Sequence, residues 1–234
     1  MDRIIRLDEV VTMLHTNDTH GRWDADYYGG GFVYLADLIE KERAHNPDVL
    51  LLDAGDTFQG NSFASFFRDR LDNPIAGGMN LLGYDALTIG NHEFNFGPDT
   101  FATMLSQANF PLLGTANMDD DGSYGFINDN VEDYINLEVD GKKVTIFGIT
   151  NPRIYRYELP TNIPGLTFYS GLEKGFEAVP QILADENPDV LVGLTHMGYS
   201  PYGDEIDSDL LLAEGVAGID VIIGGHSHSL LNPA

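Results

Sequence analysis

The chain has 234 residues, of which 43% are hydrophobic, and contains 26 Gly and 11 Pro but no Cys. This length and composition fit one large globular domain or two small ones and exclude disulfide frameworks, cysteine-ligated metals and thiol nucleophiles. The 12 basic and 37 acidic residues give a formal net charge of −25, which repels the phosphates of duplex nucleic acid. We therefore expect an acidic globular protein with no duplex nucleic-acid partner.

Two kinds of targeting segment are not expected in this sequence. No apolar run reaches the roughly 18 residues of a membrane-spanning helix. The start, MDRIIRLDEVV, has acidic residues where a signal peptide has its apolar stretch. Without internal repeats or low-complexity linkers, residues 1–234 are expected to form one domain.

Short apolar runs predict buried strands, and apolar residues at helical spacing predict helices. In chain order the strands are Val10–Thr16, Val49–Ala54, Ala86–Gly90, Pro111–Ala116, Val190–Thr195 and Val221–Gly225. The helices contain Phe32–Ile39, Phe101–Leu105 after Pro98, and Phe176–Leu183 before Asn187. Such alternation indicates an α/β fold with a largely parallel core sheet. Tyr134–Val139 and Val144–Ile149, joined by Asp140-Gly141, predict one antiparallel hairpin.

Residues that can bind metals follow five of the predicted strands. In chain order they are Asp18 and His20, Asp56, Asn91 and His92, His196, and His226 and His228. An open α/β sheet has its ligand crevice at the carboxyl ends of its strands, so we expect these side chains to gather there.

Seven of these residues offer carboxylate, amide or imidazole ligands: Asp18, His20, Asp56, Asn91, His196, His226 and His228. This mixture suits divalent Mn²⁺, Zn²⁺, Fe²⁺ or Co²⁺. Because seven ligands exceed the need of one ion once water is included, two ions that share a carboxylate are expected, as in phosphoryl transfer. Asp56, alone after its strand and next to Gly55, is the predicted bridge.

Each motif by itself also has a purely structural explanation. Asp18 and His20 could form a strand-end turn, and Asp56 could cap a helix. Asn91-His92 could be a strained turn, and His196 a hydrogen-bonded core residue. Because these explanations would have to coincide at five strand ends, the combined pattern favours a metal site.

Five sequence blocks occur in order between residues 11 and 228: VTMLHTNDTHG, LLDAGDTFQGN, IGNHEFN, LTHMG and GGHSH. Together they resemble the motifs of the calcineurin-like metallophosphoesterases. LHTND and GNHEF resemble the branch that contains 5′-nucleotidases, UDP-sugar hydrolases and 2′,3′-cyclic phosphodiesterases. The resemblance implies an α/β four-layer fold, with two mixed β-sheets packed as a sandwich and flanked by helices, in place of a single parallel sheet.

The resemblance also implies the roles of individual residues. One metal is expected on Asp18, His20, Asp56 and His228, and a second on Asp56, Asn91, His196 and His226. His92 is expected to contact the phosphate and to assist the leaving group. Asn95 stands where the family often has an Asp that orients this histidine. An amide accepts a hydrogen bond from the ring but provides no charge.

The implied reaction is hydrolysis of a phosphomonoester, with a nucleotide as the small-molecule substrate, by in-line attack of a metal-bound hydroxide. One alternative is a phosphodiesterase that acts on 2′,3′-cyclic nucleotides or nucleotide sugars. Another is an inactive metal-binding module of a larger surface protein. Family members usually continue into a separate nucleotide-binding domain after the last motif, so the catalytic domain is expected to be C-terminally incomplete here. The resemblance favours an extracytoplasmic location.

Overall fold

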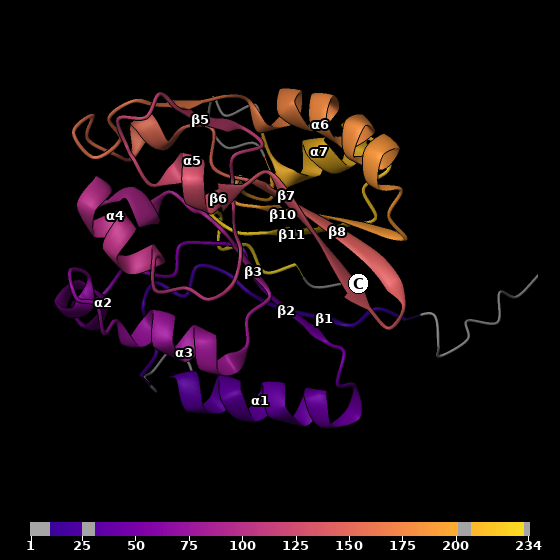
Figure 1. The fold of residues 1–234 in the computed structure, drawn as a ribbon, viewed down its shortest axis with the longest axis horizontal. Coiled ribbons are helices and arrows are strands. Elements are labelled where there is room, and N and C mark those ends of the chain that lie inside the picture. The colour runs from indigo at the N-terminus through magenta and orange to yellow at the C-terminus, as the bar shows by residue number, and fades with distance from the viewer. Residues whose placement is uncertain (1–9, 25–30, 201–206, 232–234) are drawn as a thin grey trace, which may run out of the picture.

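The computed structural model describes residues 10–24, 31–200 and 207–231 (Figure 1). Residues 1–9, which contain most of the segment behind the expectation about a leader, lie outside this part of the chain. Among the described residues, no helix combines the length and the apolar character needed to cross a bilayer.

The first half of the chain forms a five-stranded parallel sheet in the order β1-β2-β3-β4-β6. Its strands are β1 (Met13–Thr16), β2 (Leu50–Asp53), β3 (Ala86–Thr88), β4 (Leu112–Leu113) and β6 (Val131–Glu132). Helices α1 (Gly31–His45), α3 (Pro74–Leu82) and α4 (Pro98–Leu105) share a hydrophobic cluster with Leu51 and Leu87 of this sheet. These helices therefore cover its outer face.

The second half forms a mixed sheet in the order β11-β10-β8-β7. Its strands are β7 (Tyr134–Val139), β8 (Lys142–Ile149), β10 (Val190–Thr195) and β11 (Val221–Gly224). β8, β10 and β11 are parallel, whereas β7 pairs with β8 as the predicted antiparallel hairpin. Helices α6 (Gly171–Glu186) and α7 (Asp209–Gly215) pack through Val179, Ile182 and Leu212 on its outer face.

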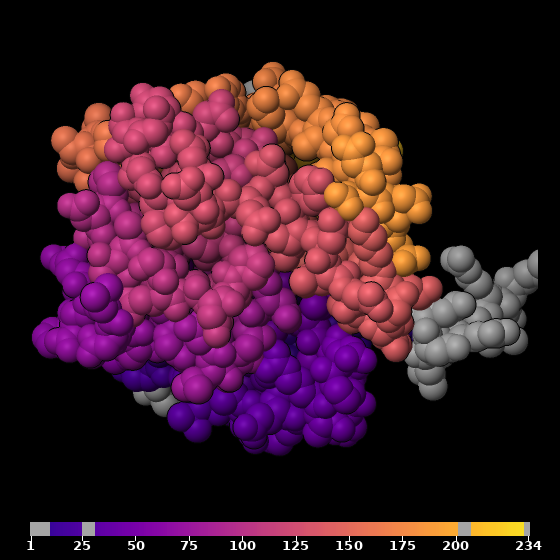
Figure 2. All heavy atoms as spheres, in the orientation of Figure 1, coloured from indigo at the N-terminus to yellow at the C-terminus, as the bar shows by residue number. Residues whose placement is uncertain are grey.

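The two sheets face each other across a second hydrophobic cluster. Leu50 and Leu52 of β2 point into it and meet Ile146, Val192 and Leu194 of the mixed sheet, whereas Leu51 points to the helices. This alternation follows from the two-residue period of a strand. In Figure 1 the strands of the two sheets lie between α1 and α3 at the bottom and α6 and α7 at the top, and Figure 2 shows the early and late parts of the chain on opposite sides. The predicted sandwich of sheets flanked by helices is confirmed.

Several elements were not expected from the sequence. They are α2 (Ser62–Phe67), α3, α5 (Ile127–Asn130), α7, β6, the antiparallel pair β5 (Met118–Asp120) and β9 (Leu166–Phe168), and the 3₁₀ turns η2 (His92–Phe94) and η3 (Ile154–Arg156). Helix α3 has clear signals. Asn73 caps its start, Pro74 occupies the first turn, and Gly83 ends it in the left-handed conformation.

Candidate metal centre

The candidate residues lie in loops at the carboxyl ends of strands from both sheets. Asp18 and His20 follow β1, Asp56 follows β2, Asn91 and His92 follow β3, His196 follows β10, and His226 and His228 follow β11. Backbone hydrogen bonds tie the loops together, because Asp18 N donates to Gly55 O and His20 N donates to Asp56 O, each at 2.9 Å. Across the sheets, the His226 amide donates to the Asp18 carboxylate at 3.0 Å.

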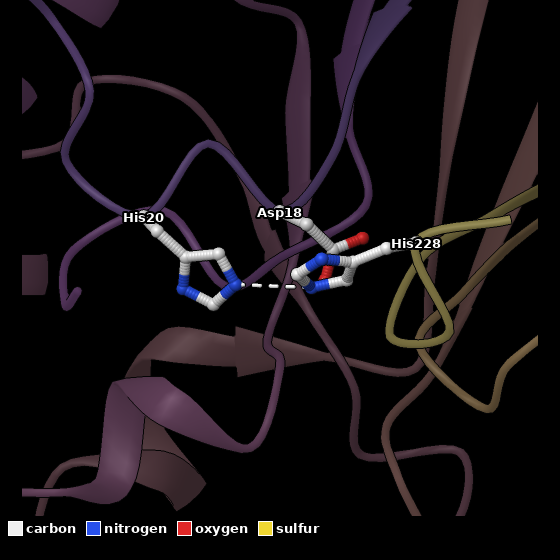
Figure 3. Close-up of side chains that lie close together, drawn as sticks. All are labelled: Asp18, His20 and His228. Carbon is white, nitrogen blue, oxygen red and sulfur yellow. Dashed lines mark hydrogen bonds and ion pairs between the residues drawn. The ribbon is translucent and has the colours of Figure 1, made fainter. Parts of the chain in front are cut away.

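The structure brings Asp18, His20 and His228 together in one cluster (Figure 3). His20 Nε2 lies 3.1 Å from His228 Nε2, which lies 3.2 Å from Asp18 Oδ1. His20 Nδ1 lies 3.0 Å from the carbonyl of Gln59, which can only accept, so the ring proton is on Nδ1. The lone pair of Nε2 is then available to a cation, as in histidine ligands held by a carbonyl.

Asp56, His196 and His226 form a second cluster, deeper in the molecule. His196 is fully buried, and its Nδ1 donates to the carbonyl of Ala54. Its Nε2 lies 3.0 Å from Asp56 Oδ2 but has no hydrogen-bond partner in the part of the chain that the structure describes. His196 Nε2 and Asp56 Oδ2 are thus close together without hydrogen bonding to each other, as two ligand atoms of the same cation are.

Asn91 provides a further test of whether the donor set fits a metal. Its side chain is buried, and neither the amide oxygen nor the amide nitrogen has a hydrogen-bond partner among residues 10–24, 31–200 and 207–231. A buried polar group left unpaired is costly, roughly 1–3 kcal/mol. A cation bound to the amide oxygen removes that cost for the oxygen.

Among the described residues three clusters of potential ligands occur, and Asp56 belongs to two of them. It groups with His196 and His226, and separately with His20 and His92, with the atoms of each group within 4.8 Å of one another. The Asp56 carboxylate therefore lies between histidines that follow strands of the first sheet and histidines that follow strands of the second. A carboxylate that bridges two cations would occupy such a position. The donor set and its orphaned atoms fit two divalent cations.

The backbone is strained at many of these residues. Asp18, His20, Asp56, His226 and His228 have positive φ values between 50° and 76°. Among the other described non-glycine residues only Asp140, in the hairpin turn, and Asn187, at the end of α6, share this feature. Such strain concentrates at functional sites, where the surrounding structure enforces it.

Burial and the pairing of opposite charges shift the pKa values in the second cluster. Burial disfavours the charged form of both Asp56 and His196, but each stabilises the charge of the other. The pKa of Asp56 is therefore lowered and that of His196 raised. Burial also lowers the pKa of His226, to about 4, so that this imidazole is neutral and available as a ligand.

Glu93 is a central residue that the sequence reasoning missed. Its carboxylate is fully buried and accepts hydrogen bonds from the backbone amides of Asp56, Thr57, Phe58 and Gly90. Because Glu93 joins the loops after β2 and β3, it fixes Asp56 relative to Asn91. Its place in the GNHEF block was the available signal.

His92 lies beside the clusters, and its amide donates to Asp56 Oδ1 at 2.8 Å. Its Nδ1 lies 2.7 Å from Asn95 Oδ1, so the structure pairs the two predicted catalytic residues. Tyr157 and Glu158, which follow β8, were missed. Tyr157 Oη lies 3.3 Å from His226 Nε2, and Asn95 Nδ2 donates to Glu158. No local motif marked either residue, because both lie beyond the turn η3 that follows β8.

Comparison with known proteins gives consistent similarities. Residues 11–230 match the model of the family described as calcineurin-like phosphoesterase. The chain is 32% identical to the trifunctional nucleotide phosphoesterase protein YfkN of Bacillus subtilis, with 95% of this chain and 16% of that protein covered. It is 35% identical to the snake venom 5′-nucleotidase of Gloydius brevicauda, with 94% of this chain and 37% of the venom enzyme covered.

Solved structures agree. The crystal structure of YfkN matches with a TM-score of 0.80 and 31% identity, over 96% of this chain and 74% of that structure. By contrast, the chain spans well under half the full length of the two curated relatives, YfkN and the venom 5′-nucleotidase.

Proposed function

Because the chain belongs to the calcineurin-like phosphoesterase family, in the branch of 5′-nucleotidases and YfkN, we propose that it is a dinuclear phosphomonoesterase that releases phosphate from nucleotides. The observation that supports this proposal most strongly is the position of Asp56 between two groups of histidines. Nucleotide specificity is supported by the relatives, which include a nucleotide phosphoesterase and a 5′-nucleotidase.

In this proposal one cation binds Asp18, His20, Asp56 and His228. The other binds Asp56, Asn91, His196 and His226. Bound Mn²⁺, Zn²⁺, Fe²⁺ or Co²⁺ would supply positive charge for the phosphate. It would also lower the pKa of water towards neutrality, so that hydroxide is available to attack phosphorus. The charge also explains how a chain with a net charge of −25 binds an anionic substrate, since bound cations dominate the local field.

The protein's own groups orient the reaction. The amide of His92 is held by Asp56 Oδ1, so the ring is fixed beside the shared carboxylate. From this position His92, with a proton on each ring nitrogen, contacts a phosphate oxygen and transfers the proton of Nε2 to the oxygen of the leaving group, which departs as a neutral alcohol. The ring then recovers its proton from water.

One observation favours a second substrate class. The relative from Bacillus subtilis is named a trifunctional nucleotide phosphoesterase, a name that is not limited to monoesters, and hydrolysis of nucleotide phosphodiesters is the second candidate. An extracytoplasmic location is part of the proposal and is supported by the venom relative.

The test compares substrates and variants of the Mn²⁺-loaded protein. We expect phosphate release from AMP, weaker cleavage of bis-p-nitrophenyl phosphate, and loss of both metal and turnover in Asp56→Ala. Asp129→Ala, which removes an exposed carboxylate on α5, is the matched control and should retain both. Faster cleavage of the diester would favour the second candidate. Tight metal uptake without turnover of any phosphate ester would contradict the proposed activity and favour an inactive module.

A further inference from the structure

The side-chain amide of Asn95 lies between His92 and a buried carboxylate. Asn95 Oδ1 is 2.7 Å from His92 Nδ1, and Asn95 Nδ2 donates a short hydrogen bond to Glu158 Oε1. Asn95 ends the turn η2, and Glu158 follows the turn η3. Two segments more than sixty residues apart therefore meet at this amide.

Glu158 is held firmly in place. Its side chain is only 8% exposed, and its second oxygen accepts from Asn162 Nδ2 at 3.1 Å. Asn162 Nδ2 also donates to the backbone carbonyl of Asn95 at 2.8 Å. Both carboxylate oxygens thus accept from amide groups, and the loop after η3 is fastened to the loop that carries His92.

The chemistry of these groups fixes the orientation of the amide. An ionised carboxylate accepts hydrogen bonds and donates none, so the NH₂ group of Asn95 must face Glu158. The oxygen of Asn95 must then face His92, and it also only accepts. Nδ1 of His92 therefore always carries a proton, which leaves Nε2 as the ring atom available to the substrate, and the proton that the ring transfers is a second one on Nε2.

We propose that Glu158 is a positioning residue for His92. It acts through Asn95 to fix the tautomer and orientation of the ring, and it supplies the negative charge that Asn95 lacks. The catalytic consequence rests on the proposed phosphomonoesterase function, in which His92 contacts the reacting phosphate. The orientation of the ring by Glu158 does not rest on that function.

A paired exchange distinguishes this role from simple structural support. Asn95→Asp alone places two carboxylates against each other, because Asn95 Nδ2 and Glu158 Oε1 are in direct contact. Glu158→Gln in the same chain replaces one of them with an amide that donates to the introduced carboxylate. In the double variant the amide is at position 158 and the carboxylate at position 95, next to His92. The chain of hydrogen bonds from position 158 through position 95 to His92 is thereby restored.

The kinetic test measures kcat and KM for AMP with the Mn²⁺-loaded full chain. We expect kcat to fall roughly 10- to 100-fold in Glu158→Ala and in Asn95→Asp, with little change in KM. We expect kcat to recover to within about threefold of wild type in Asn95→Asp/Glu158→Gln, since the oriented network is rebuilt. Glu40→Gln, an exposed charge change on α1, is the control and should have wild-type kcat.

Metal content and thermal unfolding are measured for every variant. If Glu158→Ala fails to fold, the nearly isosteric double variant decides. Wild-type kcat in Glu158→Ala would overturn the proposal. A double variant no better than Asn95→Asp would also overturn it.

A second readout needs no activity. In the zinc-loaded protein, nitrogen NMR of labelled histidine should show the proton of His92 on Nδ1 in wild type, and a loss of this preference in Glu158→Ala. A wild-type proton on Nε2, or the same tautomer in both proteins, would overturn the proposal. If wild type hydrolyses no phosphate ester, the proposed function fails, and the tautomer alone decides the role of Glu158.

Discussion

Asp53, at the end of β2, is a buried carboxyl group whose replacement should make the protein more stable at neutral and alkaline pH. Its side chain is fully buried and accepts hydrogen bonds from the Gly55 amide and from the hydroxyls of Thr57 and Thr16. Thr16 Oγ1 lies 2.8 Å from Tyr84 Oη. Burial raises the pKa of Asp53 to about 7. In Asp53→Asn the amide oxygen keeps the Gly55 and Thr57 donors, and the NH₂ group donates to Thr16.

The size of the effect follows from proton linkage. The pKa of Asp53 rises from an ordinary 3.8 to about 7 on folding. Between these values the folded protein holds a proton that the unfolded chain has released, so stability falls as the pH rises. A shift of about three pKa units corresponds to about 4 kcal/mol. Asp53→Asn removes this loss. The free energy of unfolding of Asp53→Asn should equal that of wild type below pH 4 and should exceed it by about 4 kcal/mol at pH 8.

The assay is urea unfolding from pH 4 to pH 8 with EDTA present, so that metal binding does not contribute. Asp129→Asn, at an exposed position on α5, is the control and should show no such pH-dependent advantage. The prediction is wrong if the difference in free energy of unfolding between Asp53→Asn and wild type stays constant with pH. It is also wrong if wild type is more stable than Asp53→Asn at pH 8.

Four further predictions concern the metal centre. Gly90→Ala places a Cβ atom 2.2 Å from Asp56 Oδ1, so elemental analysis should show loss of metal; two retained ions would contradict this close approach. His92→Ala should lower kcat roughly 10²- to 10⁴-fold with both metals bound, and an unchanged kcat would exclude His92 from proton transfer. Glu93→Gln should lower the free energy of unfolding in urea by about 1–3 kcal/mol for each amide it leaves unpaired; unchanged stability would argue against its role in joining the loops. Metal binding at pH 7 should displace a proton from the Asp56 and His196 pair, because the pKa of His196 is raised, so affinity should increase with pH. Calorimetry in two buffers of different ionisation enthalpy measures that proton, and equal heats would contradict it.

The strands and the loops that follow them were predictable because both leave local signals. A continuous apolar run such as VLLL at residues 49–52 is buried on both faces, and the run itself marks the strand. The residues after β1, β2, β3, β10 and β11 could be expected to meet because parallel strands end at the same edge. The division of the strands between two sheets could not be read from periodicity, since both sheets contain the same kind of apolar run. The family resemblance predicted two sheets but did not assign strands to either, and the structure supplies that division.

The supporting residues of the site were harder to find because their roles depend on distant partners. Glu93 accepts hydrogen bonds from a loop more than thirty residues away, and Glu158 contacts Asn95 across more than sixty residues. No local spacing encodes such contacts. Helix α3 is a different case, because Asn73, Pro74 and Gly83 are local signals that mark its ends.

The central claim is that Asp56 bridges two cations held by residues from both sheets. Anomalous diffraction from crystals grown with Mn²⁺, measured on both sides of the manganese absorption edge, tests it most directly. The account predicts two manganese peaks roughly 3.5–4 Å apart, one on each side of the Asp56 carboxylate. A single peak, or two peaks of which one has no contact with Asp56, would contradict it.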